Sequence, residues 1–260
     1  MSVKIATWNV NSITGRIKGV IDWTVKNQPD VLCLQETKCV DEKFPYRKFN
    51  AAGYPHIAHH GEKAYNGVAL ISKHPIIGLQ KGFPDEPESA ARRLIGGTIN
   101  GIRVVNVYVP HGTRIGTDKF TAKIEWIERL RRYFDEEFDV EDDVLLCGDL
   151  NIAPREIDVW KISIWKNKLH FTKPERDTLL HLKKWGFIDL FRHINDDERA
   201  FSWWDYFHPH SVDWDKGLRL DHIWTSESLA ERCRDCWIDK EPRSLEKPSD
   251  HAPVVAEFIM

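Results

Sequence analysis

Residues 144–151 constrain the fold of this chain more than any other stretch. The first four, Val-Leu-Leu-Cys, are apolar without alternation, which is typical of a strand buried on both faces. A glycine ends the run, and Asp149 and Asn151 follow two residues apart. Side chains two residues apart on a strand project to one side, so both groups would leave the core together at the strand's C-terminal end. Gly, Asp and Asn are also ordinary turn residues, so this stretch alone is compatible with a simple turn.

Other predicted strands repeat this pattern of an apolar run followed by polar side chains. The first strand closes on Asn9 and Asn11, and the second is followed by Glu36. The candidate reactive residues are Asn9, Glu36, Tyr108, Asp149, Asn151, Asp221, Asp250 and His251. Polar groups at the ends of buried strands are where an enzyme places its chemistry. Taken singly, each is more often a cap or a turn residue, so the prediction depends on the whole set converging in space.

The spacing of apolar residues predicts many short strands and a few long helices. Strands are expected at residues 3–11, 30–34, 55–59, 67–72, 76–80, 94–99, 102–109, 144–149, 218–224 and 254–259, and helices at 16–27, 121–134 and 175–185. Residues 152–171 read as a long loop or broken helix outside the core, with exposed Trp160, Trp165 and Phe171. Strands joined by hairpin-length gaps predict two packed mixed β-sheets flanked by helices, an α/β fold.

Length and charge narrow the class of protein. At 260 residues the chain can bury a sizeable core, and no repeat or linker divides it, so we expect one domain over residues 1–260. No apolar stretch could span a bilayer, and the first strand leaves no room for a signal peptide, so we expect a cytoplasmic protein. The net charge of −3 argues against a surface that is basic all over and leaves room for a local basic groove.

Cys233-x-x-Cys236 has a metal-type spacing but no second pair, so a structural zinc is not expected.

The candidate set favours metal-assisted phosphoryl chemistry. Its acidic members are hard oxygen donors with no thiolate among them, which suits Mg²⁺ or Mn²⁺. An amide, a phenol and a histidine beside such a metal can neutralise phosphate oxygens, while one carboxylate orients the attacking water.

Nine short segments, in order along the chain, carry a family resemblance. They are residues 8–12 (WNVNS), 34–38 (LQETK), 65–69 (YNGVA), 106–110 (NVYVP), 148–154 (GDLNIAP), 185–189 (WGFID), 201–206 (FSWWDY), 218–221 (LRLD) and 247–253 (KPSDHAP). With them the chain resembles the exonuclease III family of AP endonucleases, within the DNase I-like endonuclease/exonuclease/phosphatase superfamily. The resemblance implies a four-layer α/β sandwich with the site at one rim of two packed sheets.

The resemblance also implies how the metal would be held. Glu36 would be the principal ligand of Mg²⁺, for which Mn²⁺ could substitute. Asn9 and Asp250 would help hold the metal or the scissile phosphate. Asp149 and Asn151 would complete the surroundings of the metal.

The catalytic roles follow from the same resemblance. Asp149 would orient or deprotonate the water, with Asn151 fixing its carboxylate. His251, held by Asp221, would donate to a non-bridging phosphate oxygen, where charge builds in the transition state. Tyr108 would contact the phosphate or the leaving oxygen.

The implied substrate is double-stranded DNA with abasic sites or blocked 3′ ends, cleaved by a monomer. The implied reaction is cleavage 5′ to an abasic site, together with 3′–5′ exonuclease and 3′-phosphatase activity. The residues expected to bind substrate are Asn11, Arg92, His111, Lys166, Lys168, Trp203, Leu218 and Leu220. Of these, the last three either form a small apolar pocket for a sugar without its base or are simply core residues. The basic residues either line a DNA groove or belong to an ordinary solvated surface.

Three residues depart from the family pattern. Thr14 stands where bacterial relatives usually have Arg, so Arg16 would have to supply any phosphate contact there. His111 stands where relatives carry Gln or Asn near the DNA. His222 would point away from the face of Asp221 and is expected to be a buried neighbour. Two other functions stay open, a phosphoesterase of the same superfamily with another substrate, or a DNA-binding protein on an inactive nuclease scaffold.

Overall fold

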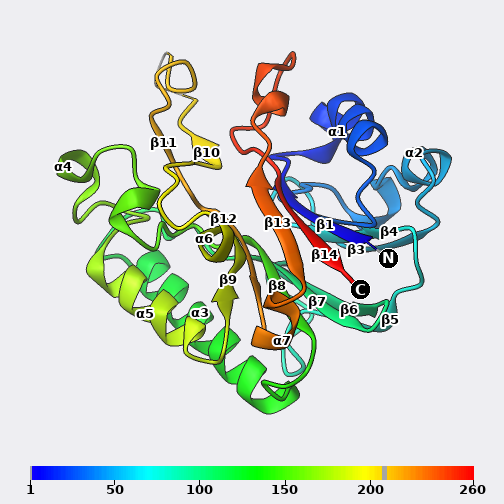
Figure 1. Ribbon diagram of the computed structural model, residues 1–260, viewed down its shortest axis with the longest axis horizontal. Helices are drawn as coiled ribbons and strands as arrows, with labels where there is room; N and C mark the ends of the chain where they lie inside the picture. Colours follow the sequence, from blue (N-terminus) through cyan, green and yellow to red (C-terminus); the bar gives the residue numbers. More distant parts are fainter. Residues whose placement is uncertain (1, 207–209) are drawn as a thin grey trace.

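The computed structural model describes residues 2–206 and 210–260, which form four layers (Figure 1). Two mixed β-sheets pack face to face, and helices cover the outer face of each sheet. This is the predicted α/β sandwich. Residues 201–207 are the densest aromatic cluster in the sequence, and Phe207, the last of them, lies outside the described residues. No helix in the described part of the chain is long and apolar enough to cross a membrane.

The first sheet has the strand order β13-β14-β1-β2-β4-β3. Its strands are β1 (Ser2–Asn9), β2 (Val31–Gln35), β3 (His56–His60), β4 (Val68–Ser72), β13 (Cys233–Ile238) and β14 (Val254–Ile259). Strand β1 pairs with β14 in antiparallel fashion, which places the two ends of the chain side by side (Figure 1).

The second sheet has the strand order β5-β6-β7-β8-β12-β9. Its strands are β5 (Ile77–Lys81), β6 (Leu94–Ile99), β7 (Ile102–Tyr108), β8 (Val144–Asp149), β9 (Ile188–Asp189) and β12 (Asp221–Thr225). A small pair of strands, β10 (Trp203–Trp204) and β11 (Gly217–Leu218), projects beside the two sheets (Figure 1).

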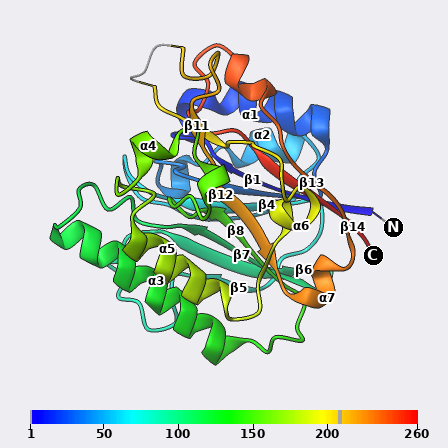
Figure 2. The ribbon, with the colours of Figure 1, turned by 60° about the vertical axis from the view of Figure 1, so that its left-hand side comes forward.

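Helices cover the outer faces of both sheets (Figure 2). The helices are α1 (Ile13–Asn27), α2 (Tyr46–Ala51), α3 (Asp118–Glu137), α4 (Ile162–Trp165), α5 (Lys173–Lys183), α6 (Leu190–Ile194) and α7 (Glu227–Ala230), with short 3₁₀ turns at Asp41–Lys43, Glu156–Asp158 and Glu241–Ser244. Helices α1 and α2 bury apolar side chains against the first sheet, and α3 and α5 against the second. A third apolar cluster lies between the sheets, and the strands contribute to it from both sides. Burial on both faces explains the continuous apolar runs of β2 and β8.

Parallel pairing brings the polar strand ends to one edge. Strands β1 and β2 run parallel, with Asn9 opposite Gln35, and β7 and β8 run parallel, with Tyr108 opposite Asp149. Antiparallel β12 starts at this edge, with Asp221 opposite Asp149. Since parallel strands end on the same side of a sheet, the polar residues that follow them meet there.

Several predictions about elements need correction. Helix α1 begins at Ile13, not near residue 16. The apolar spacing also predicted Val25 on the buried face of this helix, but Val25 is 49% exposed, and Trp23 and Thr24 are buried instead. Phe171 is buried, since residues 152–171 fold back onto β11 and supply Ala153 and Val159 to an apolar cluster. The first strand is also shorter than predicted, ending at Asn9.

The predicted strand 218–224 is interrupted. Strand β11 ends at Leu218 and β12 starts at Asp221, so the expected alternation of side chains breaks between them. Arg219 therefore lies against His222, with its Nη1 3.0 Å from Nδ1 of that ring, and not on the side of Asp221 as predicted. Strand β13 was not predicted from the sequence at all.

Candidate functional site

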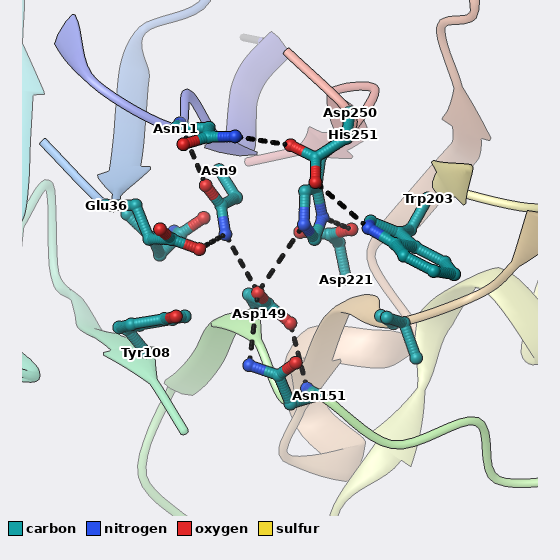
Figure 3. A network of polar contacts seen from close by, with 12 residues as sticks. Asn9, Asn11, Glu36, Tyr108, Asp149, Asn151, Trp203, Asp221, Asp250 and His251 are labelled. Atoms are coloured by element: carbon teal, nitrogen blue, oxygen red, sulfur yellow. Dashed lines mark hydrogen bonds and ion pairs between the residues drawn. The ribbon is translucent and has the colours of Figure 1, made fainter. Parts of the chain in front are cut away.

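A cleft of about 750 Å³ lies where the polar strand ends meet. Its lining includes Glu36, Tyr108, His111, Asp149, Asn151, His170, Trp203, Leu220, Asp250 and His251. Figure 3 shows the polar members turned toward one another. They come from β2, β7, β8, β10 and the loop before β14, so segments far apart in the sequence build one site.

The Asp149 carboxylate lies at the centre of this network (Figure 3). Its Oδ2 accepts a hydrogen bond of 2.8 Å from the Asn9 amide, whose other N–H donates to Glu36 Oε1, also at 2.8 Å. Its Oδ1 accepts from the backbone N–H of Asn151 at 2.8 Å. The Asn151 side chain adds a longer contact of 3.3 Å to Oδ2 and donates to the Val109 carbonyl. One carboxylate is thus oriented by two amides and a backbone group.

The backbone around Asp149 has the conformation that its residues permit. Gly148 has φ +134°, and an added Cβ would lie 1.9 Å from the Val107 carbonyl oxygen, so only glycine fits there. Asn151 has φ 54°, in the left-handed region that Asn tolerates better than most residues. The Gly-Asp-Leu-Asn sequence is therefore what allows a buried strand to turn sharply into the cleft.

His251 bridges two carboxylates. Its Nδ1 lies 2.7 Å from Asp221 Oδ2, and its Nε2 lies 3.7 Å from Asp149 Oδ2. Ser202 fixes Asp221 by donating to the same Oδ2 at 2.7 Å. Because a carboxylate only accepts, Nδ1 of His251 carries a proton and Nε2 faces the cleft.

Burial and neighbouring charges shift the pKa values of both Asp149 and His251. Burial raises the pKa of Asp149 to about 7, helped by the neighbouring Asp221 and Glu36 carboxylates and opposed by His251. Burial alone would lower the pKa of His251, but Asp221 and Asp149 outweigh it and raise that pKa to about 10. The imidazole is accordingly a cation at neutral pH, with a proton on Nε2 available to the cleft.

Glu36 carries its charge beside a cation. Its Oε2 lies 2.7 Å from the Lys38 ammonium, which also donates to Asn11 Oδ1 at 2.6 Å. Burial would raise the pKa of Glu36, but Lys38 and the hydrogen bond from Asn9 prevail and lower it. Lys38 was part of the sequence motif but was not singled out as a site residue.

Asp250 and Tyr108 flank the centre. Asp250 accepts hydrogen bonds from the Trp203 indole at 3.1 Å and from the Asn11 amide at 3.0 Å, which place its carboxylate at the rim of the cleft. Arg93 lies 4.8 Å from the centre of the Tyr108 ring and donates to the Tyr108 carbonyl. Burial and the nearby Glu36 keep the pKa of Tyr108 well above its usual range, so its hydroxyl is a donor.

The donor set suits a metal ion. One ligand atom each from Glu36, Asp149 and His251 lie within 4.8 Å of one another. The two carboxylates could hold a cation there, whereas the His251 ring, protonated on both nitrogens, has no lone pair to offer. Two of the three are carboxylates, the hard donors preferred by Mg²⁺. The Lys38 ammonium against Glu36 shows that this position attracts positive charge.

Some of the residues expected to contact substrate line the cleft, and others lie away from it. His111, Trp203, Leu220 and Lys168 line the cleft, and Asn11 reaches it through Asp250. Lys166, like Lys168, is exposed, but it does not line the cleft, and neither does the half-buried Arg92.

Leu218 does not line the cleft either. It is fully buried and packs in an apolar cluster with Val159, Phe171 and Leu220. Of the three residues predicted to form a small apolar pocket, only Trp203 and Leu220 reach the cleft. Leu218 pairs with Trp203 on β10, and Trp203 packs against the apolar cluster that contains Leu218.

Arg16 takes up contacts near the first strand, where Thr14 is too short to act. Its guanidinium donates to the Asn11 and Pro248 carbonyls and to the hydroxyl of Tyr206, a residue that lines the cleft. The contact to Tyr206 is 2.9 Å. Arg16 therefore ties the loop after β10 to the loop after β1.

Sequence reasoning missed a buried network behind Asn151. Lys123 is fully buried, and its ammonium donates to the Asn151 carbonyl at 2.8 Å and pairs with Glu175 at 2.5 Å. His170 Nδ1 lies 2.7 Å from the same carbonyl. Burial, then the charge of Lys123, keeps the pKa of His170 well below its usual range. The signal for Glu175 was present as a capping box with Thr172, but nothing local in the sequence points to Lys123.

Comparisons with known proteins agree with this geometry. A family model described as the endonuclease/exonuclease/phosphatase family matches residues 6–251. The chain is 38% identical to exodeoxyribonuclease III of Haemophilus influenzae, over 98% of this chain and 100% of that protein. A solved AP endonuclease from Archaeoglobus fulgidus superposes with a TM-score of 0.96 at 41% identity, covering 99% and 100% of the two chains. The 3′ phosphatase NExo from Neisseria, bound to a product DNA hairpin, superposes with a TM-score of 0.95 at 36% identity, with the same coverage.

Proposed function

The chain belongs to the endonuclease/exonuclease/phosphatase family as a nuclease of the exonuclease III type, and from this premise we propose that it is a Mg²⁺-dependent DNA-repair phosphodiesterase. Its proposed reactions are hydrolysis of the phosphodiester 5′ to abasic sites in duplex DNA, 3′–5′ exonucleolytic degradation and removal of 3′-phosphates. The names of the similar proteins, an exodeoxyribonuclease III, an AP endonuclease and a 3′ phosphatase, support all three.

One observation carries the proposal. A buried carboxylate, Asp149, and an imidazolium, His251, face each other at 3.7 Å in a cleft, and each is held by its own hydrogen-bond partners. A phosphate bound in the cleft against both groups would meet a carboxylate that orients water and an imidazolium that donates a proton. This is the arrangement that phosphoryl transfer requires, because catalysis there consists mostly of positioning and charge stabilisation.

We assign a separate catalytic role to each of these site residues. Asp149, oriented by Asn9 and Asn151, holds the attacking water and receives its proton. His251 donates from Nε2 to a non-bridging phosphate oxygen, and Asp221 holds the ring in place through Nδ1. Tyr108 donates its hydroxyl to the phosphate or to the leaving oxygen.

Glu36, Asp149, Asn9 and Asp250 would hold the metal, which supplies Lewis-acid stabilisation of the phosphate oxygens when bound. Glu36 is the best placed of these four, since Asn9 fixes one of its oxygens while the other already faces a cation. Leu220 and Trp203 would lie against the sugar of the substrate.

A set of three duplexes tests the proposal. One carries an internal abasic analogue, one a recessed 3′-hydroxyl end and one a 3′-phosphate, each incubated with Mg²⁺ and then with EDTA. We expect Mg²⁺-dependent release of product from all three. A substrate left intact at high enzyme removes that activity from the proposal, and cleavage that persists in EDTA contradicts the metal requirement.

A further inference from the structure

A buried cluster of charged side chains lies beside the catalytic loop and takes no part in the proposed chemistry. This arginine cluster consists of Asp158, Asp189, Arg192, Arg219 and His222, all at most 6% exposed. Arg219 donates to both oxygens of each carboxylate. The shortest contacts are 2.7 Å from Nε to Asp158 Oδ1 and 2.7 Å from Nη2 to Asp189 Oδ2. Two carboxylates and two guanidinium groups cancel, so the cluster is neutral only while His222 is uncharged.

The contacts of His222 define its tautomer. Arg219 Nη1 lies 3.0 Å from Nδ1 of His222, and a guanidinium can only donate, so Nδ1 is the acceptor. Nε2 lies 3.1 Å from the Ile152 carbonyl, which can only accept, so Nε2 carries the proton. The neutral imidazole thus connects the arginine cluster to the backbone of Ile152 through one hydrogen bond on each side of the ring.

The carbonyl that His222 holds belongs to a strained part of the site. Ile152 directly follows Asn151, whose backbone is left-handed at φ 54°. Lys123 and His170 bind the Asn151 carbonyl from one direction, and His222 binds the next carbonyl from another. Leu220, beside Arg219, accepts from the Leu150 N–H at 2.9 Å. The Leu150 N–H and the carbonyls of Asn151 and Ile152 are therefore fixed from outside the loop.

We propose that His222 is a positioning residue for the nuclease reaction. Through the Ile152 carbonyl it keeps Asn151 where the backbone N–H and side chain of that residue orient Asp149. Its role rests on the proposed function, but it concerns the geometry of the protein before any metal or DNA binds. His222, on the strand β12 that pairs with β8, thereby helps to set the orientation of the water-activating carboxylate.

Two substitutions at this position test the proposal. His222→Phe keeps a ring but loses both hydrogen bonds, and His222→Gln retains an acceptor for Arg219 and a donor for Ile152. We expect His222→Phe to lower kcat on the 3′-phosphate duplex about tenfold or more with little change in KM, since misplacement by about 1 Å can cost about 10² in rate. His222→Gln should recover most of that loss. The matched control is His60→Phe, which removes another buried histidine whose ring is bonded to a backbone carbonyl, and it should leave kcat unchanged.

A double-mutant cycle with Asn151→Ala separates positioning from general destabilisation. If His222 acts through Asn151, His222→Phe should cost less activity in the Asn151→Ala background than in the wild type, because the side-chain part of the effect is already lost and only the backbone N–H can still be misplaced. Equal losses in the two backgrounds would overturn the proposal, and so would a His222→Phe enzyme with wild-type kcat.

Nuclear magnetic resonance of the metal-free protein gives a readout that does not depend on activity, and the part of it measured on the wild type needs no folded variant. The side-chain nitrogens of His222 should report the neutral Nε2–H tautomer at pH 7, and the amide of Asn151 should shift in His222→Gln less than in His222→Phe. A charged ring or the other tautomer would overturn the proposal even if His222→Phe failed to fold. If the wild-type protein cleaved none of the three duplexes, the proposed function would fail, while these spectra would still decide the role of His222.

Discussion

Asp149 owes its environment to four side chains that surround it. Asn9 and Asn151 donate to its carboxylate, His251 faces it as a cation, and Glu36 lies within reach of the same metal-sized space. Two carboxylates held this close repel each other unless a cation lies between them. The imidazolium and the Lys38 ammonium supply part of that charge in the protein alone.

Asp149→Asn keeps the shape of the side chain but removes its negative charge. General base catalysis contributes about 10²–10⁴-fold, so single-turnover cleavage should fall at least that far while DNA binding survives. Binding could tighten, because a carboxylate that repels phosphate is gone. Retention of more than about a tenth of wild-type cleavage would contradict the assigned role. The exposed Asp197→Asn is a charge-matched control that should cleave normally.

Glu36→Gln tests whether the Glu36 carboxylate is a ligand of the metal. The substitution preserves the hydrogen bond from Asn9 but removes the charge of a proposed direct ligand. We expect weaker Mg²⁺ affinity, seen as a shift of the activity titration to higher Mg²⁺, with partial recovery at high Mg²⁺ or with Mn²⁺. An unchanged titration curve would exclude Glu36 as a ligand.

At the scale of elements, the parallel pair β7 and β8 determines where Asp149 leaves the core. Val107 lies opposite Gly148 in the register, and the backbone of β7 approaches that glycine so closely that no side chain fits between them. The close approach puts Tyr108 beside Asp149 at the same level of the sheet. A glycine at a strand end here serves the geometry of the site.

Gly148→Ala should therefore be severely destabilising. The new Cβ would overlap the Val107 carbonyl oxygen, at a φ that non-glycine residues rarely adopt, so the free energy of unfolding should fall by about 3 kcal/mol or more. Chemical denaturation measures the loss. Gly101→Ala is the control, because its φ is also positive, at +83°, but an added Cβ meets nothing within 4 Å. Similar losses in both variants would show that the close approach to β7 has no energetic consequence.

The segment around α4 presents lysines on the side of the cleft. Lys168 lines the cleft and Lys166 is exposed next to it, at the end of α4. If they contact DNA phosphates, the Lys166→Ala, Lys168→Ala double variant should reduce the slope of log affinity against log salt by about 0.9 per lost contact. A filter-binding titration at several salt concentrations measures it. The control is the double variant Lys183→Ala, Lys184→Ala at the far end of α5, which should keep the wild-type slope. If the Lys166→Ala, Lys168→Ala variant also kept the wild-type slope, the DNA groove would lie elsewhere.

At the scale of the whole molecule, buried histidines make stability depend on pH. Burial lowers the pKa of His222 to about 4 and also lowers the pKa values of His59, His60 and His170. His251 is the opposite case, because its carboxylate partners raise its pKa. The contribution of the neutral histidines to the free energy of unfolding falls as the pH falls, because the folded protein cannot protonate them without disrupting their contacts.

The contribution of His222 has a definite sign. Its pKa is about 4 when folded against 6.5 for the ordinary group, so between these values the unfolded chain binds a proton that the folded chain does not. Its stabilisation is complete above pH 6.5 and is lost as the pH falls toward 4, at up to about 1.4 kcal/mol per pH unit. Denaturation of the wild-type protein and His222→Gln across pH 4–8 should show the difference between them shrinking on acidification. A constant difference would mean that His222 titrates normally in the fold.

The sequence by itself determined the features that depend on local pattern. Continuous apolar runs predicted the strands buried on both faces, and the polar residues after them, such as Glu36 and Asp149, do lie at one edge of the sheets. The bounds of β6 and β14 agreed with the prediction because turn residues or proline delimit them. The family resemblance supplied the expected roles, which no spacing or composition could.

Only the tertiary structure decided which side chains meet across the molecule. Asn9 and Asp149 are 140 residues apart in the chain, and their contact exists because the first sheet packs face to face on the second. The folding of residues 152–171 onto β11 buries Leu218 and Phe171, which local pattern could not distinguish from pocket or surface residues. The break before Asp221 turns Arg219 toward His222. Periodicity reports how one segment is buried, whereas these contacts depend on the long-range order of strands, and that order is a property of the packed sheets as a whole.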